Sequence, residues 1–116
     1  MASEIGIVVP ALVHEFEAAP PAHLAEQWRK HWDLWSFHSP DWWRRHWTKT
    51  GLVDVETADL IQDGWRYWVA WDEATLELGF VPKRFAAFVP EWLAMMRTDA
   101  GENLAFARML ARRLTP

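Results

Sequence analysis

Hydrophobic positions in the first third of the chain fall into two patterns. Ile5 to Val9 is a continuous apolar run, rich in β-branched residues and ending at Pro10, which predicts a strand buried on both faces. From Ala22 to about Trp35, large apolar residues recur every three or four positions opposite a charged face, which predicts an amphipathic helix. These recurring residues are Leu24, Trp28, Trp32 and Trp35.

The next predicted helix carries its own start and stop signals. Ser39 is a good N-cap, Pro40 suits the first helical position, and Gly51 is a C′ stop. Helical spacing gives it two aromatic faces, Trp43 with Trp47 and Trp42 with His46. So much apolar surface predicts that the helix packs against another part of the protein.

Two strands joined by a tight turn are predicted after that helix. Leu52 to Ile61 alternates between apolar and polar residues, and Trp65 to Trp71 is apolar on both faces except for Arg66. Between them, Asp63-Gly64 is a strong hairpin signal. We therefore expect an antiparallel β-hairpin whose second strand is central in a sheet.

The rest of the pattern returns to helix. Pro82 and Pro90 suit first-turn positions and predict short helices near 83–89 and 91–97. Asp99 followed by Glu102 resembles a capping box that opens a last helix to about Leu114. Residues 1–116 are thus expected to form a single α+β domain.

Composition narrows the classes of function. The net charge of −4, without a basic stripe, argues against nucleic-acid binding. The absence of cysteine excludes disulfides and thiolate metal sites, and it fits the cytoplasm. No apolar run is long enough to span a bilayer, and the negative charge disfavours a membrane surface. Ten tryptophans indicate either a core filled with large rings or an aromatic-walled cavity.

Few side chains offer chemistry on spacing alone. His31, His38 and His46 do not have the spacing of a zinc site. Asp41 near His38 fits a carboxylate at a helix start better than an acid–base pair. No phosphate-binding glycine loop and no nucleophile motif is present. The residues alone therefore predict no catalytic group and no metal site.

Several blocks of sequence resemble a known family. IGIVVP, FHSPDWWRRHW, TGLVDVETADLIQDGW with the following RYWVAW, and the tail RTDAGENLAFARMLARR resemble the C-terminal half of a bacterial family of class I S-adenosylmethionine-dependent methyltransferases. The resemblance covers nearly the whole chain. It implies part of a Rossmann-like, doubly wound sheet of seven strands. In that sheet Ile5–Val9 would be the fifth strand, Leu52–Ile61 the sixth, and Trp65–Trp71 the seventh, lying between them.

The resemblance also implies a division of labour. The family holds S-adenosylmethionine at a glycine-rich turn after the first strand and an acidic residue ending the second, and neither is in this sequence. The chain would then be the acceptor-side part, binding no cofactor and not catalytic alone. If a cofactor-binding half is supplied, His38, Trp42, His46 and Trp47 are expected to line the acceptor side.

Two partner arrangements follow from that division. Ile5–Val9 would be an apolar strand edge open to pairing, which predicts a homo-oligomer or a complementing cofactor-binding chain. The alternative interpretation is a non-enzymatic small-ligand or protein-interaction module with a tryptophan-rich apolar pocket.

Overall fold

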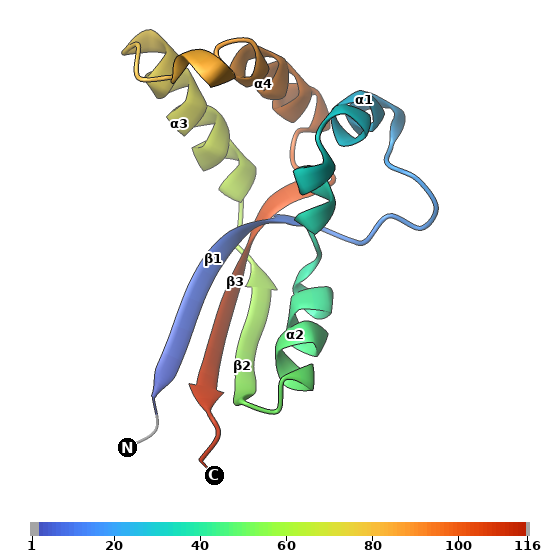
Figure 1. Ribbon diagram of the computed structural model, residues 1–116, viewed down its shortest axis with the longest axis vertical. Coiled ribbons are helices and arrows are strands. Elements are labelled where there is room, and N and C mark those ends of the chain that lie inside the picture. Colours follow the sequence, from blue (N-terminus) through green and yellow to red (C-terminus); the bar gives the residue numbers. More distant parts are fainter. Residues whose placement is uncertain (1–2, 116) are drawn as a thin grey trace.

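The protein has an α+β fold in which helices gather at one end of a three-stranded sheet (Figure 1). The computed structural model describes residues 3–115, and the following elements lie within them. The strands are β1 (Glu4–Leu12), β2 (Val53–Leu60) and β3 (Leu104–Arg113). The α-helices are α1 (Ala22–Lys30), α2 (Pro40–Lys49), α3 (Gly64–Glu77) and α4 (Phe88–Asp99). Short 3₁₀ segments cover Trp32–Ser36 and Lys83–Phe85.

The sheet has the order β1-β3-β2, and both outer strands pair antiparallel with β3. Strands β1 and β2 therefore run in the same direction, toward the end where α1, α3 and α4 form a cap (Figure 1). Met109 in the middle of β3 pairs with Ile7 on one side and Ala58 on the other. A bulge between Val55 and Thr57 shifts the register of β2. Helix α2 packs beside β2 against the sheet.

Strand β3 replaces the helix predicted from Asp99 to Leu114. Alanines and Met109 alternate along its buried face, but alanine has little intrinsic preference for strands, so the local sequence favours helix. Pairing on both sides overrides that preference. Asp99 does not open a helix; it ends α4, and its carboxylate accepts hydrogen bonds from the backbone N–H groups of Asn103 and Leu104.

Helix α3 replaces the predicted hairpin strand Trp65–Trp71. Asp63 adopts a left-handed conformation, with φ of 56°, and turns the chain into a helix that starts at Gly64 instead of into a second strand. Trp68 packs against the core of the cap, whereas Tyr67 and Trp71 are 68% and 70% exposed. The predicted strand is therefore wrong, because a short run that is apolar on both faces fits a helix as well as a buried strand. The strand between β1 and β2 is β3, not residues 65–71.

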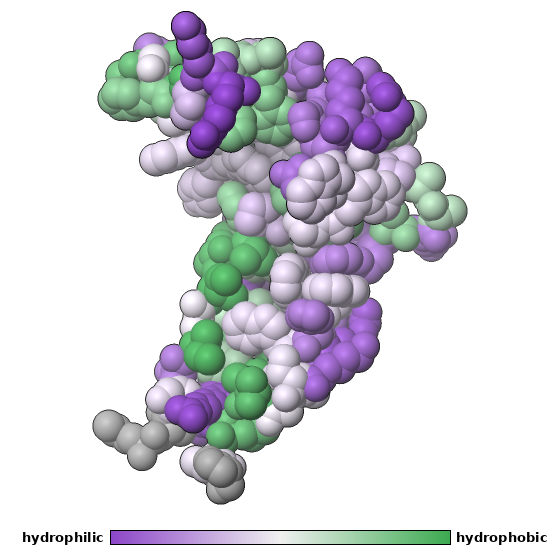
Figure 2. All heavy atoms as spheres, viewed as in Figure 1, coloured by the Kyte–Doolittle hydropathy of each residue, from purple (hydrophilic) through white to green (hydrophobic). Residues whose placement is uncertain are grey.

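Strand β1 was also predicted to be buried on both faces, and the structure places it at an edge. Ile5, Ile7 and Val8 are 44%, 42% and 53% exposed. Because Ile5 and Ile7 pair with Ala111 and Met109, they share the face that α2 covers farther along the sheet. Val8 lies on the opposite face. Figure 2 shows apolar side chains gathered along the flank of the molecule that β1 occupies.

The helix predicted from Ser39 is confirmed in detail. The Ser39 hydroxyl accepts a hydrogen bond from the Trp42 N–H, Pro40 is the first helical residue, and Gly51 follows the end with φ of 70°. The strand predicted at Leu52–Ile61 is confirmed as β2.

Two other helix predictions have the right place and the wrong bounds. The helix predicted over Ala22–Trp35 is α1 and a separate 3₁₀ segment, because His31 is extended and breaks it, and Trp32 is 85% exposed. The two short helices expected at 83–89 and 91–97 are the 3₁₀ turn Lys83–Phe85 and the longer helix α4.

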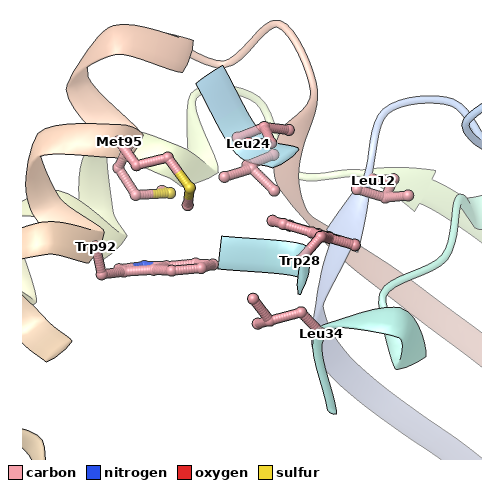
Figure 3. Packing of buried hydrophobic residues seen from close by; sticks show 8 residues of the cluster. Leu12, Leu24, Trp28, Leu34, Trp92 and Met95 are labelled. Atoms are coloured by element: carbon pink, nitrogen blue, oxygen red, sulfur yellow. The ribbon is translucent and has the colours of Figure 1, made fainter. Parts of the chain in front are cut away.

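The main core lies in the cap, not under the sheet. Trp28 of α1 and Trp92 of α4 are almost completely buried, with ring centroids 6.4 Å apart (Figure 3). Leu12, Leu24, Leu34 and Met95 surround them (Figure 3). A second, smaller cluster under α2 contains Val55, Met109 and Ala111.

The molecule is extended for its size. Its radius of gyration is 16.1 Å, against about 13 Å for a compact domain of this length. Its accessible surface of 7974 Å² exceeds, by about 1,400 Å², the value of about 6,600 Å² typical of a monomer of this mass. Among the described residues, no helix is long and apolar enough to cross a membrane.

Candidate functional site

Polar side chains meet where β1 and β2 end and α2 begins. A hollow of about 380 Å³ opens there, and its charged lining groups come from the loop after β1, from α2 and from β2. These groups are Glu15, Asp41, Arg45 and Asp59. In open α/β sheets, ligands bind at the carboxyl ends of parallel strands, which is the end of β1 and β2 that the hollow occupies.

Glu15 joins the loop after β1 to the start of α2. One carboxylate oxygen lies 2.6 Å from Nδ1 of His38, and the other accepts a hydrogen bond from the Ser39 N–H. The Leu12 N–H donates to the His38 carbonyl at 3.1 Å. His38 is therefore held by the end of β1 through both its backbone and its ring.

The ionised form of Glu15 is the favoured one. Burial is the largest single influence and raises the pKa of this carboxyl, but the hydrogen bonds with His38 and Ser39 together outweigh it and bring the pKa below its ordinary value. An ionised carboxylate only accepts hydrogen bonds, so Nδ1 of His38 carries the proton. In the neutral ring, Nε2 is then the basic nitrogen.

A three-ring stack runs from His38 along α2. The Trp42 indole lies between two imidazoles, with its centroid 3.6 Å from that of His38 and 4.7 Å from that of His46, and all three rings are nearly parallel. Trp43 meets Trp42 edge-on at 5.0 Å. Helical spacing of four residues aligns Trp42 with His46, and His38, which precedes the N-cap of α2, stacks on Trp42 from outside the helix. Three of the four residues predicted to line the acceptor side are thus brought together.

Trp47, the fourth predicted residue, lies elsewhere. It packs with Trp43 on the cluster beneath α2 and lines a separate groove of about 460 Å³ beside Ile5, Leu52 and Val53. The groove follows the part of the sheet face that α2 leaves open next to β1. Trp47 therefore belongs to the sheet side of α2 and not to the His38 stack.

The other titratable groups do not form a metal site. Within residues 3–115, no three histidine or carboxylate side chains converge as metal ligands would. Asp41 is exposed at the first turn of α2, and the acidic partner of His38 is Glu15 instead. His23 hydrogen-bonds to the buried carboxylate of Asp99 at 2.8 Å, which ties α1 to the end of α4.

Glu15 is the site residue that sequence reasoning missed. It lies in a stretch without clear periodicity, and its partner is 23 residues away. The available signal was its position six residues after the predicted strand Ile5–Val9, since the residues that follow the carboxyl end of a strand face the ligand side of α/β sheets. Comparison of the chain with protein-family models, curated proteins and solved structures found no match.

Proposed function

We propose that this chain is the acceptor-side part of an S-adenosylmethionine-dependent methyltransferase and that it works with a cofactor-binding unit. The observation that carries the proposal is the strand order β1-β3-β2, with an antiparallel strand between two that run in the same direction. This is the order that the sequence resemblance implies for the fifth, seventh and sixth strands, once β3 replaces residues 65–71 as the seventh.

The apolar character of β1 supports the proposal that the cofactor-binding unit docks along this edge strand. Side chains on both faces of β1 are apolar, as in an interior strand, yet the strand is at an edge. Such an edge pairs readily with a further strand. The groove between Ile5 and Trp47 would then be filled by an element of the same unit. An accessible surface about 1,400 Å² above the monomer value fits a chain with an uncovered interface.

The chain's own glycines do not fit the methyl donor. Gly64 follows β2 at a strand-to-helix turn, but a Cβ there would meet the Phe106 side chain at 3.1 Å, so the space beside it is already filled. Gly51 and Gly79 follow helix ends and face open space. We therefore assign the donor site to the other unit and derive no chemical step through it.

The role of this chain is to receive the methyl acceptor beside α2. The exposed His46 ring at the end of the stack and the free edge of Trp42 offer contact to an apolar or aromatic acceptor. We assign to Nε2 of His38 the role of accepting a proton from an acceptor hydroxyl or amine, because the hydrogen bond between Nδ1 and Glu15 leaves Nε2 as the unprotonated nitrogen of the neutral ring. Trp47 takes no part in acceptor binding in this arrangement.

The test uses a lysine on each edge strand. Ile7→Lys places a charge on the β1 edge, and Leu60→Lys places one at a similarly exposed position, 37% against 42%, on β2. In sedimentation equilibrium we expect the isolated wild type and Leu60→Lys to dimerise through β1, and Ile7→Lys to remain monomeric. A monomeric wild type at high micromolar concentration would contradict the open interface.

A second measurement addresses the cofactor. In calorimetry, the chain alone is expected to give no heat with S-adenosylhomocysteine, whereas a complex formed through β1 with its partner unit binds it. Saturable micromolar binding by the chain alone, about −8 kcal/mol, would refute the division of labour. A partner that is captured by wild type, lost with Ile7→Lys and unable to bind S-adenosylhomocysteine would refute the methyltransferase assignment.

A further inference from the structure

Another cavity lies apart from the His38 stack, between the end of α3 and the segment 80–89. Its volume of about 520 Å³ is within the range of small-molecule sites. The walls are mostly apolar and include three aromatic side chains, Trp71, Phe80 and Phe85. Asp72 is the one charged residue among the described residues that line it. This composition is that of a ligand pocket with a single charged anchor.

Asp72 also lines a smaller neighbouring cavity of about 220 Å³. The rings of the cap core border that cavity, and its other charged lining residue is Asp33. The aromatic rings are those of Phe37, Trp68, Phe88 and Trp92. Along both cavities, the charged lining groups within residues 3–115 are acids, and no lysine or arginine is among them. The charge of this lining favours a cation over an anion.

The carboxylate of Asp72 has no partner in the described part of the chain. No ion pair or side-chain hydrogen bond there engages it, whereas the next residue, Glu73, pairs with Arg97. Partial burial alone raises the pKa of Asp72. A half-buried carboxylate without compensation is stabilised when a cation reaches it, so an incoming ammonium gains an interaction that the free protein lacks.

The aromatic walls add to this preference. Ring faces attract cations; the Arg84 guanidinium already lies over the Phe85 ring, 4.9 Å from its centroid, so Trp71 and Phe80 are the rings open to an incoming ammonium. Trp71 and Phe80 are 70% and 73% exposed, which is a large amount of apolar surface to leave in water without a ligand. An apolar ligand body would cover these rings.

We propose that this cleft binds an apolar molecule that carries one ammonium group, with the ammonium at Asp72 and the hydrocarbon against Trp71, Phe80 and Phe85. The inference is independent of methyl transfer, since binding needs neither the cofactor nor the β1 partner. It gives the alternative interpretation of the tryptophan-rich chain, a small-ligand module, a definite place and a ligand class.

The test compares three probes of one shape and three charges: 4-phenylbutylamine, 4-phenylbutan-1-ol and 4-phenylbutyrate. Each is titrated calorimetrically into the full chain at neutral pH. We expect the amine to bind at least tenfold more tightly than the alcohol, and the acid not to bind. Asp72→Asn should bring the amine down to the affinity of the alcohol. Glu77→Gln removes the same charge from an exposed site on α3 outside the cleft, and it should leave the tenfold preference intact.

A variant of the wall separates apolar binding from charge. Phe80→Ala should weaken the amine and the alcohol by a similar factor, because it removes apolar contact and not charge. Equal binding of amine and alcohol by the wild type would overturn the role of Asp72. If Glu77→Gln also loses the preference for the amine over the alcohol, the preference comes from the net charge of the chain and not from Asp72, and the proposal is wrong. No heat with any probe at millimolar concentration would overturn the site itself. Thermal unfolding by circular dichroism confirms that each variant is folded.

Discussion

Replacing Asp99 by alanine should destabilise the protein more than any exposed carboxylate does. The side chain is 1% exposed, and its oxygens accept hydrogen bonds from the Asn103 N–H at 3.0 Å and the Leu104 N–H at 2.9 Å. The Asn103 side-chain amide and the His23 ring each lie 2.8 Å away. Asp99 thus holds together α1, the end of α4 and the start of β3.

The magnitude follows from the two backbone donors. A buried N–H left without a partner costs about 1–3 kcal/mol, and Asp99→Ala removes the acceptor of two. The Leu104 N–H is buried and the Asn103 N–H only partly so, which places the expected loss at about 3 kcal/mol. That is a large part of the 5–15 kcal/mol typical of a domain. The side-chain partners, Asn103 and His23, can turn to water and add less.

Urea unfolding followed by tryptophan fluorescence and circular dichroism measures this loss. The matched control is Asp54→Ala, because Asp54 is an exposed carboxylate on β2, and the expected change there is within about 0.5 kcal/mol. The midpoint should fall for Asp99→Ala with little change in slope. A loss below about 1 kcal/mol, equal to that of the control, would show that water replaces the carboxylate and that the reasoning is wrong.

Two further predictions concern the stability of the protein at low pH and the replacement of glycines by alanine. Burial raises the pKa of Asp99, but hydrogen bonds from Asn103, His23 and Leu104 outweigh it and hold the pKa below the ordinary 3.8, so its stabilisation is present above that pH and lost as pH falls through the folded-state pKa. Unfolding free energy measured from pH 6 to pH 2 should therefore fall less steeply for Asp99→Asn than for wild type, and parallel curves would refute this. Gly101→Ala places a Cβ 2.5 Å from the Trp65 ring at φ of 81°, whereas Gly79→Ala has a similar φ of 72° and open space. We expect about 1 kcal/mol for Gly79→Ala and 1–3 kcal/mol more for Gly101→Ala by thermal unfolding, and equal losses would show that the ring moves freely.

Elements with complete local signals could be predicted from the sequence. The helix that begins at Ser39 carries a cap, a first-turn proline and a terminal glycine within a few residues of each other, so local energetics alone determine it. The first half of β2 alternates between apolar and polar residues, which favours a strand, and a bulge interrupts the register after Val55. The same helix also carries Trp42 and His46, which is why their stacking could be anticipated.

Elements whose structure depends on contacts with distant parts of the chain could not be predicted from the sequence. Residues 104–113 have alanines and arginines that favour helix, and they form a strand because β1 and β2 flank them. The signal Asp63-Gly64 predicts a hairpin only if a strand follows, and the helical packing of Trp68 on the cap decides otherwise. The roles of Glu15 and Asp72 could not be predicted either, because they depend on His38 and on cavity walls that are distant in the sequence.

The central position of β3 has a consequence for the order in which the protein assembles. β1 and β2 do not pair with each other. Each pairs only with β3, which is synthesised after both of them. Roughly twice as many residues separate β3 from β1 as from β2, and such a doubling adds only about 0.6 kcal/mol to the cost of closing the loop. The β2–β3 pair is thus only slightly favoured as the first to form. Until β3 is synthesised, the apolar β1 has no partner strand within the sheet and is exposed to aggregation.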